Sequence, residues 1–156
     1  MNEHSNSAAS RVSGFCGVVD VRGAEADAIE RAVPLARTLI DAGANVLLLR
    51  VKGAPDRVFA GIAKQLVEAC HGRVTFVVND RIDIALAVGA DGVHLGQDDL
   101  PMQEAKNVAR PGFLIGRTVH TDAQVRAAMQ SGAAMTPPAR KPSRTTTQKL
   151  QPSPNP

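Results

Sequence analysis

Aromatic residues are scarce in this 156-residue chain, which has no tryptophan, no tyrosine and only four phenylalanines. Proteins that bind single-stranded nucleic acids stack bases on aromatic side chains, and this chain has almost none to offer. The net charge of +3 depends on four basic residues after Met135, a stretch that contains no acidic residue. The other 14 basic residues are outnumbered by 15 acidic ones, so we expect no nucleic acid partner.

Long hydrophobic runs are also missing. No apolar segment reaches the length of a membrane span, and the polar first ten residues lack the apolar part of a signal peptide. We therefore expect no membrane partner and a cytoplasmic location. The only two cysteines, Cys16 and Cys70, have neither metal-binding nor disulfide-framework spacing, and we expect both to be small buried side chains.

What the chain does contain is a repeated pattern of a short apolar strand followed by an amphipathic helix. Residues 45–51 are almost wholly apolar, which is typical of a parallel strand buried on both faces. Pro34 interrupts the first helical stripe and predicts that the regular helix begins there, with proline in its first turn. The expected strands are 15–19, 45–51, 74–78, 92–95 and 113–117, and the expected helices are 24–42, 55–70, 81–88, 101–109 and 122–130.

Five such units in succession indicate an α/β fold. A doubly wound sheet is the alternative, but candidate ligands follow four successive strands, which favours a barrel. A complete (β/α)8 barrel usually needs roughly 200 residues or more. We therefore predict an incomplete TIM barrel of about five βα units over residues 13–135, preceded by a flexible N-terminus (1–12). Residues 136–156 hold six of the ten prolines with Thr and basic residues and predict a disordered tail.

Acidic and amide side chains follow two neighbouring strands of the predicted sheet. Asn79 and Asp80 come directly after one strand, and Gln97, Asp98 and Asp99 come after the next. Strands of a parallel sheet end at the same edge, so the two groups should meet there. Mg²⁺ typically takes one or two carboxylates together with phosphate oxygens and water, which makes Asp80 and Asp99 candidate metal ligands. Each of these aspartates could instead cap the helix that follows it.

Basic and hydroxyl side chains are expected at the same edge. Arg50 and Lys52 end the second strand on one side of the chain, a pairing suited to phosphate oxygens, although two solvated surface charges would give the same pattern. Thr118 and Thr121 follow the fifth strand, where a phosphate could bind at the helix start, and Thr121 could equally be an ordinary N-cap. We expect His94, inside the fourth strand, to be a packed histidine rather than a catalytic base.

Three segments carry a resemblance to a known family. The run NDRIDIALAVGADGVHLGQDDLP (79–101) closely resembles the thiamine-phosphate synthase family. The strand end LLLRVK (47–52) is similar to that family's QLRxK, and IGRTVHT (115–121) to its GxSxH. The resemblance covers roughly residues 14 to 134.

The resemblance implies a Mg²⁺-dependent transferase on a TIM barrel, acting on small-molecule substrates. The family joins hydroxymethylpyrimidine diphosphate to thiazole phosphate, and releases diphosphate to give thiamine phosphate. The resemblance places Arg50, Lys52 and Asn79 at the pyrimidine diphosphate and Asp80 and Asp99 at the metal. It also places Thr118 where the family commonly has Ser, and gives Arg50, Lys52 and Thr118 catalytic roles.

Two departures from the family pattern bear on activity. Leu48 replaces the Gln of QLRxK at a substrate-binding position, which removes an amide near the pyrimidine. Where a GPxxxTxTK-like loop is expected, the chain reads Met-Thr-Pro-Pro-Ala-Arg (135–140), as in a truncated or frame-shifted member. Open barrel edges at the first and fifth strands would favour self-association.

Three functions therefore stay open: the synthase, a thiazole tautomerase on the same scaffold, and a non-catalytic fragment that binds only Mg²⁺ and diphosphate. The GQDD run and the RxK pair favour the synthase.

Overall fold

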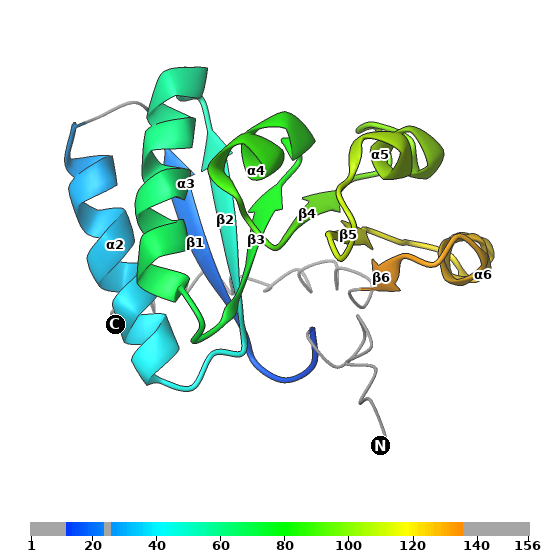
Figure 1. Ribbon diagram of the computed structural model, residues 1–156, viewed down its shortest axis with the longest axis horizontal. Coiled ribbons are helices and arrows are strands. Elements are labelled where there is room, and N and C mark those ends of the chain that lie inside the picture. The colour runs from blue at the N-terminus through cyan, green and yellow to red at the C-terminus, as the bar shows by residue number, and fades with distance from the viewer. Residues whose placement is uncertain (1–11, 24–25, 136–156) are drawn as a thin grey trace, which may run out of the picture.

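All strands of the sheet run in the same direction and lie side by side in their order along the sequence. The computed structural model describes residues 12–23 and 26–135 (Figure 1). The strands are β1 (Cys16–Arg22), β2 (Val46–Lys52), β3 (Thr75–Asn79), β4 (Gly92–Leu95), β5 (Leu114–Arg117) and β6 (Ala134–Met135). The helices are α2 (Ala26–Asp41), α3 (Asp56–Cys70), α4 (Ile82–Val88), α5 (Met102–Val108) and α6 (Asp122–Gln130).

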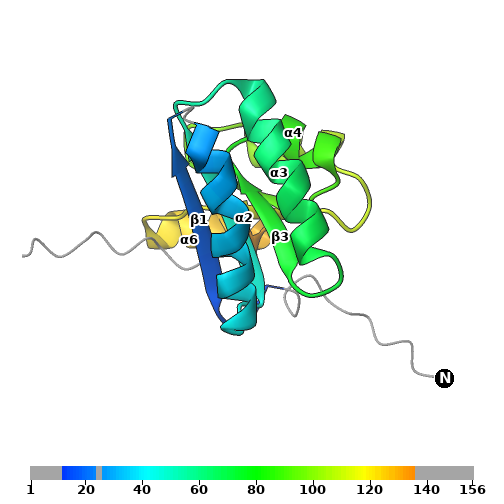
Figure 2. The same cartoon turned by 90° about the vertical axis from the view of Figure 1, so that its left-hand side faces the viewer.

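This order decides between the two predicted architectures. A doubly wound sheet reverses its strand order at a switch point, whereas this sheet runs from β1 to β6 without reversal. Figure 2 shows α2 and α3 lying on the same face of the sheet, as the outer helices of a barrel do. The prediction of an incomplete TIM barrel with five βα units is confirmed.

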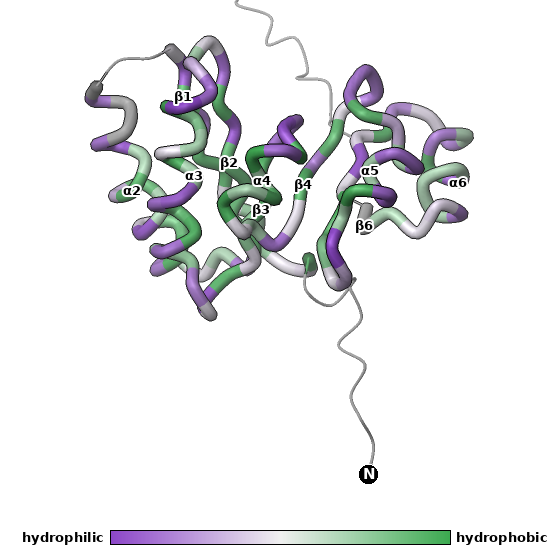
Figure 3. Tube along the Cα trace, turned by 45° about the horizontal axis from the view of Figure 1, so that its top comes forward, coloured by the Kyte–Doolittle hydropathy of each residue, from purple (hydrophilic) through white to green (hydrophobic). Residues whose placement is uncertain are grey.

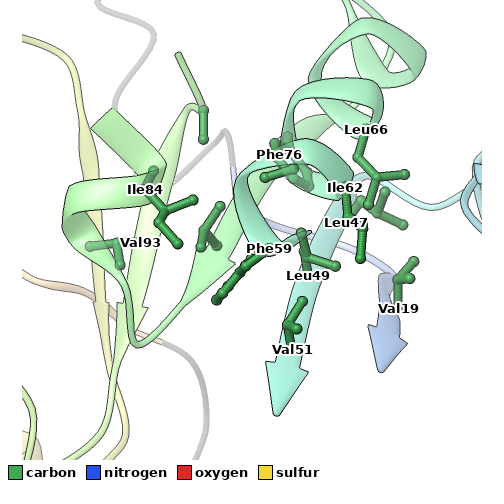
Figure 4. Packing of buried hydrophobic residues seen from close by; sticks show 14 of the residues in the cluster. Val19, Leu47, Leu49, Val51, Phe59, Ile62, Leu66, Phe76, Ile84 and Val93 are labelled. Carbon is green, nitrogen blue, oxygen red and sulfur yellow. The ribbon is translucent and has the colours of Figure 1, made fainter. Parts of the chain in front are cut away.

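The core lies between the sheet and its helices. In β1 and β2 alternate side chains are buried on the helix-facing side, among them Val19, Val21, Leu47, Leu49 and Val51. Figure 4 shows Leu47, Leu49 and Val51 beside α3, whose apolar positions recur at helical spacing. The buried residues of α3 are Phe59, Ile62, Ala63, Leu66 and Cys70. Burying one large apolar side chain stabilises the fold by about 1.5–3 kcal/mol, so this face holds the sheet and helices together.

Hydrophilic and hydrophobic residues alternate along the two long helices, α2 and α3 (Figure 3). The helical period thus turns one side of each helix toward the sheet and the other toward solvent.

Between β4 and β5 the contact is so close that a Cβ at Gly92 would lie 2.5 Å from the backbone oxygen of Leu114. Only glycine allows that approach.

Pro34 lies inside α2, so the predicted helix start at this residue is wrong. A proline in a helix interior removes the hydrogen bond to the carbonyl four residues earlier. That carbonyl belongs to Glu30, and both Glu30 and Pro34 are exposed, so water can reach it. Burial of Ala32 and Ile40 on the opposite side keeps the helix against the sheet.

The edges of the sheet also differ from the prediction. β6 pairs with β5 through Gly116↔Ala134 and Arg117↔Met135, so β1 and β6 are the edges of the described sheet, in place of the first and fifth strands. Cys16 is exposed, contrary to prediction, because it lies on the side of β1 that no helix covers.

Cys70 is buried as predicted, and burial raises the pKa of its thiol to about 12. The predicted flexible N-terminus falls almost wholly, and the predicted disordered tail entirely, outside the described residues. Within the described ranges, no helix combines the length and apolar character of a membrane span.

Candidate functional site

The predicted site residues lie together at the carboxyl-terminal edge of the sheet, which we call the rim, or on the sheet face just below it. Because all strands are parallel, the ends of β2, β3, β4 and β5 meet at this edge. The seven predicted residues are Leu48, Arg50 and Lys52 of β2, Asn79 at the end of β3, Asp80 after it, Asp99 after β4 and Thr118 after β5. The expectation of a shared edge is confirmed.

A close ion pair joins the second and third strands at the rim. The Nζ of Lys52 lies 2.5 Å from Oδ2 of Asp80, whose side chain is only 26% exposed. Asp80 is the one non-glycine residue with positive φ among those described (65°). Such a backbone conformation costs energy and is retained where the surroundings hold it, often at a functional site. The N-cap position of α4 is occupied by Arg81, so the alternative of Asp80 as a helix cap is wrong.

The loop after β4 presents Asp99. Its Oδ2 accepts a hydrogen bond from the backbone N–H of Gly96 at 2.6 Å, and this contact folds the loop back on itself. Pro101 occupies the N-cap position of α5 without a side-chain cap, so Asp99 is not a helix cap either. Helix capping, the alternative to metal binding, is therefore excluded for both Asp80 and Asp99.

His94 lies between these groups. Its Nε2 is 2.8 Å from Oγ1 of Thr118, a contact that joins β4 to the segment after β5. Burial lowers the pKa of His94, and the nearby charges of Asp80 and Asp99 act in the opposite direction. Both carboxylates are thus close enough to one imidazole to influence it. The prediction of a packed histidine agrees with its partial burial.

The guanidinium of Arg50 lies against β1. Its Nη1 is 3.2 Å from Oδ1 of Asp20, and Nη2 of Arg22 is 3.1 Å from Oδ2 of the same carboxylate. Partial burial acts to raise the pKa of Asp20, but hydrogen bonds and charge from the two arginines outweigh it and lower this pKa. Sequence reasoning missed Asp20. Its position directly after the predicted strand 15–19 could have found it, since Arg50 ends the neighbouring strand.

Leu48 lies two residues before Arg50 on the same sheet face. It pairs with Val18 of β1 and Val77 of β3, so the surface below the rim is apolar at this point. Val18 is 47% exposed, whereas Leu48 is partly buried.

Thr121 is an N-cap, which was one of its two predicted roles. The backbone N–H of Gln124 donates to Oγ1 of Thr121 at 3.3 Å, and Oε1 of Gln124 accepts from the N–H of Thr121 at 3.2 Å. This reciprocal pair is a capping box that starts α6.

The carboxylates fit a magnesium ion by their chemistry. Mg²⁺ retains several waters and needs only one or two protein carboxylates when phosphate oxygens are present. Over residues 12–23 and 26–135 no cluster of three or more His, Cys, Asp or Glu could hold a metal, so a metal here would rest on the pair Asp80 and Asp99. Lys52 currently compensates the charge of Asp80, as a bound cation would.

Known proteins resemble this chain over most of its described length. A family model described as thiamine monophosphate synthase matches residues 19–137. The thiamine-phosphate synthase of Anaeromyxobacter dehalogenans (strain 2CP-C) is 44% identical over 101 residues, which are 65% of this chain and 46% of that protein. The thiamine-phosphate synthase of Synechococcus sp. (strain WH7803) is 43% identical over 108 residues, 69% of this chain and 31% of that protein.

A solved structure gives the same result in three dimensions. The thiamine phosphate pyrophosphorylase from Pyrococcus furiosus superimposes with a TM-score of 0.65 at 33% identity, covering 76% of this chain and 56% of that one. The chain therefore spans about half the length, or less, of these relatives.

Proposed function

Because this chain belongs to the thiamine monophosphate synthase family, we propose that its rim is the diphosphate- and Mg²⁺-binding part of a thiamine-phosphate synthase site. The reaction would join hydroxymethylpyrimidine diphosphate to thiazole phosphate with loss of diphosphate. The observation that carries the proposal is the meeting of the Lys52–Asp80 pair, the Asp99 loop and the His94–Thr118 contact on adjacent strand ends.

The cationic side chains hold the leaving diphosphate. Arg50 offers a planar fork and Lys52 a point charge, and both stand at the end of β2. Negative charge grows on the diphosphate as its bond to the pyrimidine methylene breaks, and these cations stabilise it. Asn79 and the hydroxyl of Thr118 supply neutral hydrogen bonds at the neighbouring strand ends. These contacts give Arg50, Lys52 and Thr118 their proposed catalytic roles.

Asp80 and Asp99 would hold the Mg²⁺, which when bound supplies further positive charge at the diphosphate oxygens. The strained backbone at Asp80 supports this role, because it aims one carboxylate at the rim at an energetic cost. Leu48 would contact the pyrimidine ring by apolar contact alone. The substrates are small molecules, and the proposed location is the cytoplasm.

We also propose that the chain associates with itself along the β1 edge. Phe15 and Val18 are 49% and 47% exposed beside this edge, and an exposed strand edge pairs readily with another strand. Light scattering after size-exclusion chromatography should show dimers or larger species that Val18→Lys reduces. A wild-type chain that stays monomeric at high concentration would contradict this.

Two measurements on the purified chain test the function. Titration calorimetry with inorganic diphosphate in the presence of Mg²⁺ should show binding that a chelator weakens sharply. A coupled assay with both substrates should show at best slow formation of thiamine phosphate, because no described residues match the family's GPxxxTxTK-like loop.

The outcomes separate the candidates. Thiamine phosphate formation at a family-like rate would show that this chain suffices for catalysis without a segment that matches the GPxxxTxTK-like loop. Binding without turnover favours a non-catalytic module for Mg²⁺ and diphosphate. Absence of binding would refute the assignment of the rim and leave its charges as ordinary ion pairs.

A further inference from the structure

The loop between β4 and α5, residues 96–101, lies beside a cavity. The cavity has a volume of about 290 Å³ and is bounded by Gln97 and Pro101 of the loop, by Arg117, and by Gln124 and Ser131 near the ends of α6. Side chains therefore do not fill the space on that side of the loop, so packing contributes little to its position there. On that side the position of the loop therefore depends on hydrogen bonds.

Arg117 supplies two of those hydrogen bonds. It is the last residue of β5, and its guanidinium extends to the backbone of the loop. Nη1 donates to the carbonyl of Leu100 at 3.0 Å, and Nη2 donates to the carbonyl of Gln97 at 3.1 Å. The two acceptors stand on either side of Asp99. One planar group thus fixes the backbone before and after the proposed metal ligand.

Other contacts of the loop are short-range or come from the same strand end. The carboxylate of Asp99 accepts from Gly96 within the loop, which shapes it but does not attach it to the sheet. The amide Nε2 of Gln97 donates to the carbonyl of Thr118, next to Arg117. The attachment of the loop to β5 therefore runs through residues 117 and 118, and Arg117 provides two of its three hydrogen bonds.

We propose that Arg117 is a positioning residue for the site, because it anchors the loop that carries Asp99 to the end of β5. The inference rests on the proposed function, since it concerns the geometry of the proposed Mg²⁺ ligand. Arg117 stands between Gly116 and Thr118, at the second position of the segment that is similar to the family's GxSxH. Groups that orient a metal ligand typically change metal affinity 10–100-fold when they are removed.

The test compares Arg117→Met with Arg110→Met in the full chain. Arg110 is a matched control, because its Nη2 also donates to a backbone carbonyl, that of Ala90, at 2.6 Å. Ala90 precedes β4 and therefore lies at the opposite edge of the sheet from the rim. Calorimetry with inorganic diphosphate and Mg²⁺ should show binding weakened about tenfold or more by Arg117→Met and unchanged by Arg110→Met. Arg117→Lys, which keeps a charge and can reach one carbonyl, should restore part of the affinity.

Hydrogen exchange provides a readout that needs no ligand. The amides of residues 96 to 100 should exchange faster in Arg117→Met than in wild type, with Arg110→Met unchanged there. Circular dichroism checks that each variant is folded. If Arg117→Met does not fold, the same comparison is made with Arg117→Lys.

The possible failures are distinguishable. Unchanged exchange in the loop overturns the proposal, and so does faster exchange with wild-type affinity, which would make Arg117 merely structural. A wild-type chain that binds no Mg²⁺ and diphosphate overturns the proposed function and the positioning role with it, while exchange still reports whether Arg117 anchors the loop.

Discussion

The two faces of the sheet differ in their side chains: one is apolar and covered by helices, and the other carries charged groups toward the rim. On the helix-covered face, Leu47, Leu49 and Val78 are fully buried and belong to the apolar core. On the other face, β1 and β2 carry the exposed Val18 and, toward the rim, the charged groups of Asp20, Arg50 and Lys52. The strand period of two residues makes this division, since neighbouring side chains point to opposite sides. Stability and proposed chemistry can therefore be changed separately.

The largest expected effect is on the covered face. Leu66→Ala should lower the free energy of unfolding by roughly 2–5 kcal/mol, because it removes a fully buried side chain from α3 and leaves a cavity. Urea unfolding followed by circular dichroism measures this. Val18→Ala, on the open face, is the control and should change stability by less than about 0.5 kcal/mol. Equal losses in both variants would show that the two faces are not energetically distinct.

The next effect concerns the rim alone. If Asp80 is a metal ligand as proposed, Asp80→Asn should weaken Mg²⁺-dependent diphosphate binding at least about tenfold, because removing a ligand costs no less than removing the group that orients one. Asparagine tolerates the positive φ at this position, so the fold should persist. Asp98→Asn, an exposed neighbour of Asp99, is the control for charge. Titration calorimetry that finds the same affinity in both variants would leave Asp80 as a structural partner of Lys52.

A smaller effect separates capping from ligand binding at the rim. Thr121→Ala should cost about 1 kcal/mol of unfolding free energy, because it removes the cap of α6, and Thr121→Ser should restore it. Diphosphate affinity should stay unchanged in both. If Thr121→Ala weakens diphosphate binding while Thr121→Ser does not, the hydroxyl of Thr121 also binds the ligand, in addition to capping α6.

The smallest effect is a dependence of stability on acid. Hydrogen bonds from Arg81 lower the pKa of both Asp56 and Asp83. A carboxyl with a depressed pKa in the folded state stabilises above its unfolded pKa of about 3.9, and this stabilisation is lost as the pH falls through the folded value. Urea unfolding at pH 6 and at pH 3 should therefore show that the free energy of unfolding falls slightly less with acid in Arg81→Met than in wild type.

Arg57→Met is the control for that comparison. It removes an exposed arginine of α3, the helix that also carries Asp56, and in the described part of the chain Arg57 forms no ion pair. Its acid dependence should match wild type. An Arg81→Met variant with unchanged acid dependence would show that these exposed pairs contribute nothing measurable, as is common for surface ion pairs.

Much of the fold and part of the site could be read from the order of residue types. The helical period located α3 and α6 within one residue, because apolar spacing dominates where a helix has one covered side. Pro34 misled the prediction, because local propensity alone said nothing of the sheet that holds α2 in place. The shared rim was predictable too, since parallel strands bring consecutive strand ends to one edge.

Other features arose only when distant segments met. The contact of Arg50 with Asp20 depends on the register of β1 and β2, and that of His94 with Thr118 on the register of β4 and β5. The positive φ of Asp80 is a property of the folded backbone, invisible in a residue type that more often caps helices.

By itself, the sequence determined the alternation of strands and helices, the family and the residue types at the rim, because these depend on spacing along the chain. The tertiary structure alone decided which charges neutralise one another, that Cys16 is exposed, and that Arg117 reaches across to the loop of Asp99. Those properties depend on distances between strands, which are set by packing and register rather than by local order.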